Sequence, residues 1–253
     1  MRYPLRPLKF DVWVSFGNNG FVVRDNRGGH NRKTVNVSFF KEWSPEMAYV
    51  LGFIYADGAV EDCRESSRTC YLSMTNTDLR LLEKIRDVMS SNHNIYVRKG
   101  GSVIIRGRKY NQKDCHVFRI GNKMMYQDLI NIGLCPRKSL IIALPDIPAN
   151  LFNYFLRGYF DGDGCIHIEK IKMRMRIIFT SGSKVFLDQI YEILGLIGFI
   201  RQNGGAYRLV YGGKAAEMVT AFMYNEISLV PYLEYKYHKY EMYLKEKSVN
   251  RVT

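Results

Sequence analysis

The residues best suited to chemistry in this sequence are two aspartates, Asp57 and Asp163, each near the end of an apolar run. The runs read VLGFIYADG at residues 50–58 and LRGYFDGDG at residues 156–164. Small residues stand four positions apart in both runs, so they share one face of a helix and let two helix backbones approach closely. If the helices pack through these faces, both carboxylates lie side by side at the helix C-termini.

Two carboxylates beside two negative helix ends repel each other unless something positive lies between them. Hard divalent cations with oxygen ligands are the usual solution, and such ions can activate water and hold a phosphodiester for in-line attack. The alternative is a duplicated helix hairpin whose acids are only solvated end caps. Two copies in a basic chain favour the metal site. Gly58 and Gly164 follow the acids and are expected to end each helix in the left-handed conformation.

Both runs resemble the LAGLIDADG motif in its two-motif, single-chain form. The third-position glycine, the penultimate acid and the final glycine are kept in both copies: Gly52, Asp57 and Gly58, then Gly158, Asp163 and Gly164. The resemblance implies that Asp57 and Asp163 are metal-binding catalytic residues that share two or three Mg2+ ions. At the sixth position the copies differ, with Tyr55 in the first and Asp161 in the second.

The resemblance also implies supporting residues around each centre. The backbone carbonyls of Ala56 and Gly162 are expected to complete part of the metal coordination. Family members often carry a lysine or glutamine near each active centre that polarises the attacking water or stabilises the transition state. Lys138 takes that role by position in the first repeat, and Lys236 takes it in the second, with Lys239 as an alternative. For Lys236, a helix-surface or DNA-backbone lysine is an equally good interpretation.

The composition points to a polyanionic partner. The 253 residues carry a formal net charge of +13 and the pI is near 9.5, and lysines and arginines that neutralise phosphates release counterions. The five cysteines form no C-x-x-C pair and the five histidines show no ligand spacing, which argues against a zinc site. No apolar run reaches the length of a membrane span, and the first residues do not resemble a secretory signal. We expect a soluble protein of the cytoplasm or an organellar matrix, with no membrane partner.

The duplication extends beyond the motifs. Amphipathic helices are predicted over residues 77–89 and 183–194, which superpose at an offset of 105 (187 − 82). Farther on, residues 117–123 resemble residues 208–214 at an offset of 91 (208 − 117). The smaller offset predicts a longer hairpin in the first half, near residues 107–114.

Each half reads as helix, hairpin, helix, hairpin, helix, and the first helix starts at Ser44 and Pro45. The hairpins are expected at residues 59–76, 94–121, 165–181 and 199–211. We therefore predict an α+β fold in which two pseudo-twofold-related αββαββα halves form an antiparallel β-sheet saddle for DNA around two packed motif helices. This agrees with what the resemblance implies. The expected division is an N-terminal extension (1–42), a first repeat (43–147) and a second repeat (148–253).

Basic residues are concentrated on the strands that would face DNA. From residue 171 the chain alternates, which places Lys172, Arg174 and Arg176 on one face of a strand. His167 falls on the same face of the sheet, and such a ribbon fits the major groove, whereas a solvated outer face is the alternative. The other expected DNA contacts are Arg64, Arg68, Arg98, Lys99, Arg106, Arg108 and Lys109 in the first half and Arg201, Gln202 and Arg208 in the second. Because the halves carry different side chains, the target is expected to be asymmetric.

These features favour a monomeric, site-specific double-strand DNA endonuclease of the LAGLIDADG homing type, Mg2+-dependent and intron-encoded, which leaves staggered ends. Two alternatives on the same fold stay open: a maturase that binds intron RNA, and a DNA-binding regulator that no longer cuts. Loss of cutting usually accompanies loss of a motif acid, and both acids remain here. Self-splicing is not expected, because the chain starts with Met1 and lacks a terminal His-Asn pair.

Overall fold

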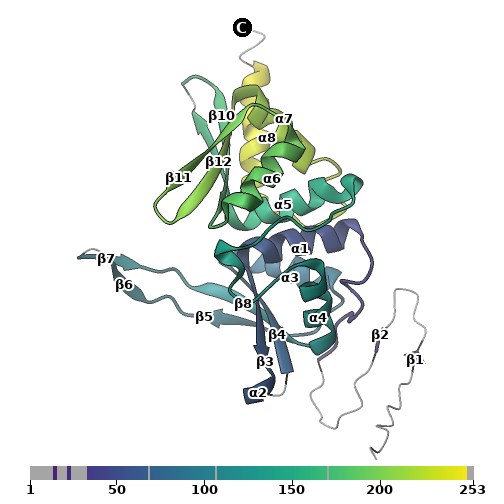
Figure 1. Cartoon of the computed structure of the whole chain (residues 1–253). Helices are drawn as coiled ribbons and strands as arrows, with labels where there is room; N and C mark the ends of the chain where they lie inside the picture. Colours follow the sequence, from purple (N-terminus) through teal and green to yellow (C-terminus); the bar gives the residue numbers. More distant parts are fainter. Residues whose placement is uncertain are drawn as a thin grey trace, which may run out of the picture.

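In the computed structural model of the chain, the two motif runs form helices α1 (Pro45–Asp57) and α5 (Phe152–Asp163) (Figure 1). Helix α1 starts as predicted: the Ser44 side chain accepts a hydrogen bond from the Met47 N–H at 3.1 Å, and Pro45 occupies the first turn. Apolar residues occur on all sides of α1, so this helix is buried rather than half exposed. The motif helices lie at the centre of the molecule.

Helices α1 and α5 meet through the small residues of the motif. A Cβ atom added to Gly52 would lie 2.0 Å from the carbonyl oxygen of Phe155, and one added to Gly158 would lie 2.0 Å from the carbonyl oxygen of Tyr49. Real Cβ atoms do not approach a neighbour so closely, and glycine alone permits this contact at either position. The reciprocal contacts confirm the close helix packing that the spacing predicts.

A four-stranded antiparallel sheet follows each motif helix, with the order β3-β4-β8-β5 in the first half and β11-β12-β10-β9 in the second. The strands are β3 (Gly58–Cys63), β4 (Thr69–Asn76), β5 (Ile95–Arg98), β8 (Cys115–Gly121), β9 (Gly164–Glu169), β10 (Arg174–Ser181), β11 (Gly198–Asn203) and β12 (Ala206–Gly212). Gly121 lies opposite Tyr71 in the first sheet, and Gly212 lies opposite Arg176 in the second. Strands β8 and β12 are therefore equivalent, which explains the offset of 91 (212 − 121) in the sequence.

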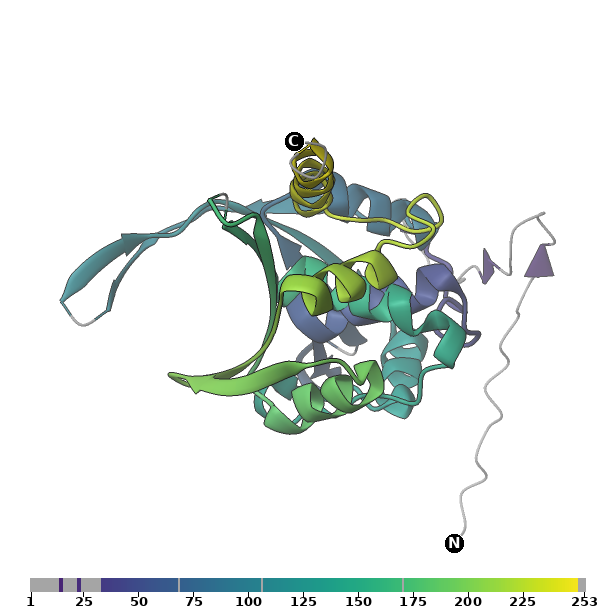
Figure 2. The same cartoon turned by 90° about the horizontal axis from the view of Figure 1, so that it is seen from above.

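Helices cover one side of the sheets and leave the other side open (Figures 1 and 2). They are α3 (Leu79–Val88), α4 (Lys123–Ile132), α6 (Lys184–Leu194) and α7 (Gly213–Met223); the one-turn α2 (Arg64–Ser67) joins β3 to β4, and α8 (Glu234–Val249) follows the second half. Each half runs αββαββα, so the predicted α+β fold class is confirmed. None of the helices in the described parts of the chain is long and apolar enough to cross a membrane.

The first half carries an additional hairpin, in which β6 (Ser102–Ile105) pairs with β7 (Arg108–Asn111). We call strands β6 and β7 together the arm. It projects from the body of the molecule on the open side of the sheets (Figure 2). A longer hairpin is predicted near residues 107–114; the extra length is present as a separate pair of strands that begins at Ser102.

The structure describes residues 14–15, 22–23, 33–67, 69–105, 107–169 and 171–249. The expected DNA contacts Arg68 and Arg106 lie outside these residues, as does most of the expected N-terminal extension. Near the N-terminus, β1 (Val14–Ser15) pairs with β2 (Val22–Val23).

The glycines that follow the motif acids differ from the prediction. Gly58 has φ −101° and ψ 160°, and Gly164 has φ −88° and ψ 156°, so both are extended rather than left-handed. Each begins a strand directly at the helix end. An added Cβ would lie 2.7 Å from the Ile54 carbonyl oxygen in the first case and 2.4 Å from the Phe160 carbonyl oxygen in the second. Close approach, not a positive φ, is what requires glycine here.

Candidate active site and nucleic-acid interface

Asp57 and Asp163 lie where the two motif helices end side by side. A Cβ atom added to Gly162 would lie 2.4 Å from the Cβ atom of Ala56 and 3.4 Å from the carboxyl carbon of Asp57. The helix ends are thus in direct contact, and each acid is followed at once by the first strand of its own sheet. The acid pair therefore occupies the point where both sheets begin.

The surroundings of both acids disfavour their negative charge. Burial, together with the charge of Asp163, raises the pKa of Asp57 to about 6, and burial also raises the pKa of Asp163. Three groups act in the opposite direction. The Asn76 amide donates to Asp57 Oδ2 at 3.2 Å, and the ammonium groups of Lys138 and Lys236 attract both carboxylates. Two neighbouring carboxylates whose pKa values are raised by partial desolvation indicate a site that is stabilised by a bound cation.

Lys138 reaches the end of α1 from the segment between the two halves. It begins the short 3-10 helix η1 (Lys138–Leu140), directly after Arg137, which has a left-handed φ of 57°. Its buried ammonium donates to the Ala56 carbonyl oxygen at 3.3 Å. Burial lowers the pKa of this ammonium, and the two carboxylates oppose that change. A cation at a helix C-terminus also interacts favourably with the helix dipole.

Lys236 reaches the end of α5 from the first turn of α8. This lysine is only 2% exposed, and its ammonium donates to the carbonyl oxygens of Phe160 at 2.5 Å and Asp161 at 3.0 Å. Burial lowers the pKa of the ammonium, while nearby carboxylates raise it. Lys239, the alternative, is exposed and lies 5.6 Å from the centre of the Tyr235 ring. The geometry therefore places Lys236, and not Lys239, at the acid pair, and it does not fit a surface lysine.

The donor atoms at this centre suit a hard divalent cation. Within the described residues, no three His, Cys, Asp or Glu side chains cluster in a way that could hold a metal ion. An ion at the acid pair would therefore be shared by two carboxylates and take its other ligands from backbone carbonyls, water or a phosphate. Mg2+ is commonly bound in this way, through one or two carboxylates, several waters and substrate phosphates. The residues present fit Mg2+.

Four predicted basic residues share the open face of the second sheet: His167 lies opposite Arg176, and Arg201 lies opposite Arg208. The β10 residues that alternate with them are buried against the helices, so the basic side chains point away from the core. Gln202 lies opposite Tyr207 and belongs to the other face, because side chains alternate along a strand. Gln202 therefore does not share the open face with the other predicted contacts of the second sheet.

The basic run between β9 and β10 is partly a turn rather than a strand. The chain reverses at residues 171–173, where Met173 has a left-handed φ of 45°, so the strand begins only at Arg174. Lys172 accordingly lies in the turn and forms an ion pair with Glu169 at 3.4 Å. Arg174 faces the same Glu169 across the ladder. This end of the face is less purely basic than predicted.

In the first half, several predicted contacts already have acidic partners. The Nε atom of Arg64 donates to both carboxylate oxygens of Asp62, at 2.9 and 3.0 Å. Lys99 forms an ion pair with Asp114 at 2.8 Å. These exposed pairs contribute little to stability, so DNA phosphates could replace the carboxylates at small cost.

Arg119 is a further basic residue on the open face of the first sheet, and sequence reasoning misses it. Its guanidinium lies 3.9 Å from the centre of the Tyr71 ring, and its Nη2 atom donates to Glu61 at 2.7 Å. On β8 it stands between the buried Phe118 and Ile120. That alternation is visible in the sequence and could have identified Arg119.

The arm presents both basic and apolar side chains to solvent. Arg108 and Lys109 on β7 are exposed, as is Arg98 at the base of the arm on β5. Ile104 is 73% exposed and Tyr110 is 49% exposed. A projecting basic hairpin of this kind can follow a phosphate backbone beyond the sheet itself.

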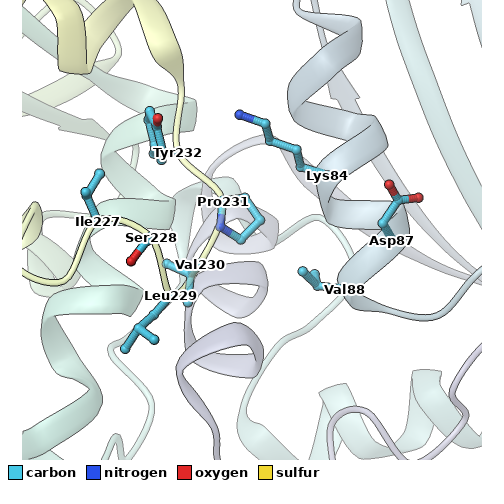
Figure 3. Close-up of a pocket in the computed structure, with 9 residues that line it drawn as sticks. All are labelled: Lys84, Asp87, Val88, Ile227, Ser228, Leu229, Val230, Pro231 and Tyr232. Atoms are coloured by element: carbon cyan, nitrogen blue, oxygen red, sulfur yellow. The ribbon is translucent and has the colours of Figure 1, made fainter. Parts of the chain in front are cut away.

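A separate pocket of ≈ 320 Å³ lies between α3 and residues 227–232 (Figure 3). Its lining residues are Lys84, Asp87, Val88, Ile227, Ser228, Leu229, Val230, Pro231 and Tyr232. Neither motif aspartate and neither buried lysine lines it. The pocket marks the junction of α3 with the segment that leads into α8.

Residues 152–217 match the sequence profile of the LAGLIDADG-like domain. The chain carries a LAGLIDADG-like domain. This region includes all of α5, β9, β10, α6, β11 and β12, so the predicted resemblance is confirmed. No curated protein matches the chain in sequence.

Solved structures support the same fold. The chain is similar to the meganuclease I-SmaMI bound to uncleaveable DNA with a TTCT central four, with a TM-score of 0.54 and 15% identity over 80% of this chain and 89% of that chain. A second I-SmaMI structure, with a TTGT central four, gives a TM-score of 0.53 and 16% identity over 83% of this chain and 94% of that one. At this identity the similarity shows that the two proteins share the LAGLIDADG homing endonuclease fold.

Proposed function

We propose that this protein is a site-specific double-strand DNA endonuclease that acts as a monomer. One observation carries the proposal: Asp57 and Asp163 end two helices in direct contact, and a buried lysine reaches each helix end. The LAGLIDADG-like domain and the fold shared with a DNA-bound meganuclease support it. The chain contains two motif copies, so one molecule supplies both halves of the centre.

In this proposal, Asp57 and Asp163 hold two or three Mg2+ ions, with the carbonyl oxygens of Ala56 and Gly162 as further ligands. When bound, the ions supply the positive charge that stabilises the attacking and leaving oxygens of a phosphodiester. The protein fixes the spacing of the two carboxylates, because the backbones of α1 and α5 are in direct contact at the motif glycines. Partial desolvation of the two carboxylates strengthens the charge interactions at this site.

Lys138 and Lys236 are assigned to the two scissile phosphates, one for each strand. Each ammonium is already held by a main-chain carbonyl oxygen at a helix end, so little reorganisation is needed when DNA arrives. An ammonium in this position can donate to a non-bridging phosphate oxygen or orient the attacking water. Because burial lowers both pKa values, each ammonium also gives up a proton more readily than an exposed lysine.

The two open sheet faces are the proposed DNA surface. The contacts assigned in the second half are His167, Lys172, Arg174, Arg176, Arg201 and Arg208, and those in the first half are Arg64, Arg98, Lys99, Arg108 and Arg119. The arm extends the surface of the first half only, which favours an asymmetric target. Cutting across the junction of two half-sites would leave staggered ends.

The proposal is tested by incubating the purified protein with a complex library of double-stranded DNA in Mg2+ and sequencing every new end, with Asp163→Asn as the control. Recurrent staggered ends at one long sequence, absent with the variant, are expected. Tight DNA binding without new ends would instead favour a DNA-binding regulator. Binding to intron RNA without new DNA ends would favour a maturase. Either result would overturn the proposal that the protein is an endonuclease.

A further inference from the structure

The sixth motif position differs between the two copies, and the structure shows what the difference does. Tyr55 and Asp161 are equivalent residues, and so are Tyr49 and Phe155, because both pairs are separated by the motif offset of 106 (161 − 55). Across the helix contact, the Tyr49 hydroxyl donates to Asp161 Oδ2 at 2.8 Å. The equivalent pair, Phe155 with Tyr55, makes only an edge-to-face ring contact at 5.4 Å between centroids. One side of the helix pair is therefore polar and the other aromatic.

The carboxylate of Asp161 also binds the residue that leads into α8. Its Oδ2 atom accepts a second hydrogen bond, from the Leu233 N–H at 2.9 Å. Asp161 is 1% exposed and Leu233 is 3% exposed, so this contact is shielded from water. The Leu233 carbonyl oxygen in turn accepts hydrogen bonds from the Lys236 and Tyr237 N–H groups in the first turn of α8, at 3.0 and 3.2 Å. A buried carboxylate thus holds the start of that helix.

The contact between α5 and α8 runs in both directions. While the Asp161 carboxylate accepts from the residue before α8, the Lys236 ammonium donates back to the Asp161 carbonyl oxygen. The carboxylate lies at the positive end of α8 and the ammonium at the negative end of α5, and both placements are favourable. The position of Lys236 is therefore coupled to that of Asp161.

Two more residues on the same face of α5 hold the segment that precedes α8. Tyr154 and Arg157 stand seven and four positions before Asp161, so the three side chains follow one helix face. The Tyr154 hydroxyl donates to Glu226. Arg157, fully buried, donates from Nε to the Met223 carbonyl oxygen at 2.6 Å and from Nη2 to the carbonyl oxygen of residue 225 at 2.6 Å. Asp161 is the last of these anchors and the one nearest to Lys236 in sequence.

A polar contact on the outer side of the start of α8 is weaker. Glu234 pairs with Lys84 at 2.9 Å and with Arg80 at 3.7 Å, but all three side chains are substantially exposed. Exposed ion pairs of this kind hold a helix only loosely in salt. The pocket between α3 and residues 227–232 also leaves that side of the segment open (Figure 3).

We propose that Asp161 is a positioning residue for the second centre: its hydrogen bond to Leu233 fixes the first turn of α8 and so places the Lys236 ammonium at the end of α5. Lys138 has no such dependence, because it reaches α1 from η1. The role for Lys236 in DNA cleavage rests on the proposed function. The positioning itself does not, and it can be measured without DNA.

The first test measures the reactivity of the two buried lysines in the metal-free protein. Trace acetylation followed by mass spectrometry gives the labelling rate of Lys236 relative to that of Lys138. Because both lysines are labelled in the same sample, their ratio does not depend on the reagent concentration. In Asp161→Ala we expect this ratio to rise by about tenfold or more, because local opening exposes the Lys236 amine. Asp161→Asn removes the same charge but keeps an acceptor oxygen for Leu233, so it should raise the ratio much less than Asp161→Ala. An unchanged ratio in Asp161→Ala, or equal ratios in both variants, would overturn the proposal.

The second test resolves the two DNA strands. On a duplex target with each strand labelled, Lys236→Met identifies the strand that depends on that lysine, and Asp161→Ala should slow the same strand by about tenfold or more. Tyr55→Phe is the matched control, since it alters the equivalent position in α1, and it should leave the ratio of strand rates unchanged. The ratio does not depend on the folded fraction of the sample. Equal slowing of both strands would overturn the positioning role, whereas a wild-type protein that cuts nothing would refute the endonuclease and leave the acetylation test standing.

Discussion

Helices α1 and α5 end in the same Asp-Gly pair, but different structures supply the lysine at each end. Lys138 comes from a short 3-10 turn after a left-handed residue, and it donates to the Ala56 carbonyl oxygen. Lys236 comes from the long helix α8, which is held to α5 by Asp161. The backbone contact between the motif helices is duplicated closely, whereas the means of placing the amine is not. A pseudo-symmetric centre therefore needs equivalent positions for its groups and not equivalent elements to hold them.

The open sheet faces differ in the same way. On the second sheet, Arg176 lies opposite His167, with no acid at that step of the ladder. On the first sheet, Arg119 already pairs with Glu61 and lies over the Tyr71 ring. The first half has the arm in addition, and the second half has no equivalent between β11 and β12. On the proposed DNA surface, the two halves therefore present different side chains to their half-sites.

The largest expected effect tests the part that the halves share. Gly52→Ala and Gly158→Ala each place a Cβ atom 2.0 Å from a carbonyl oxygen of the facing helix, which only a separation of the backbones can relieve. We expect each to lower the free energy of unfolding by about 3 kcal/mol. Chemical denaturation measures this, with Gly101→Ala as the control, because nothing lies within 4 Å of a Cβ atom at that position. A loss in only one of the two variants would show that the helix contact is not reciprocal.

A smaller effect concerns the charge on the acid pair. Because the pKa of Asp57 in the folded protein is about 6, the folded state holds its proton more tightly than the unfolded chain does. The stability of the metal-free protein should therefore fall as the pH rises from about 4 to 6 and then level off. Asp57→Asn removes this loss and should stabilise the metal-free protein at pH 7.5 by about 2 kcal/mol, with little effect near pH 4.

Thermal unfolding in EDTA at the two pH values measures the acid-pair effect. Asp163→Asn should act in the same direction, and the double variant should gain less than the sum, because the first substitution already removes the repulsion. Added Mg2+ should raise the Tm of the wild type more than that of either variant. Lower stability of Asp57→Asn at pH 7.5 would contradict the electrostatic account of this centre.

The next effect separates the two sheet faces. Arg176→Ala should weaken binding to the second half-site by about 1–2 kcal/mol, because a free arginine contact to DNA is lost. Arg119→Ala should cost less at the first half-site, since DNA must first displace Glu61 from that side chain. Gel-shift titrations on targets with one half-site scrambled measure the two losses separately. Equal losses would mean that the ion pair on the first sheet does not matter for DNA binding.

The smallest effect concerns the arm. Lys109→Ala should change affinity only slightly but reduce the slope of log affinity against log salt by about 1, as expected for one phosphate contact. Lys184→Ala is the control, because that lysine lies on α6 and pairs with Asp188. The footprint of the protein should stay unchanged in both variants. An unaltered salt dependence of affinity in Lys109→Ala would show that Lys109 makes no phosphate contact and would contradict a role for the arm in DNA binding.

Local patterns in the sequence predicted much of this fold. The spacing of Gly52 and Gly158 gave the helix contact because a small residue every fourth position has one strong structural use. The role of Gly58 was harder to predict, because glycine serves both left-handed caps and tight contacts, and sequence does not distinguish them. The second strand of the β9–β10 hairpin was expected from residue 171 and begins only at Arg174, since alternating residues can also occur in a turn.

Contacts between residues far apart in the chain could not be predicted from the sequence. The bond from Leu233 to Asp161 joins residues 72 positions apart, and it depends on where α8 docks. Sequence position suggested Lys236 but left Lys239 open, and only the burial of Lys236 separates them. The pairing of Arg119 with Glu61 likewise depends on the order of strands in the sheet.

The most direct test of the central claim is strand-resolved cleavage of one target duplex by Asp57→Asn and Asp163→Asn, with binding measured in parallel. If the two acids form one shared centre, each substitution should abolish cutting of both strands, by more than about a thousandfold, while affinity for the target stays within a few fold. Continued cleavage of either strand, or loss of binding together with cleavage, would contradict the account.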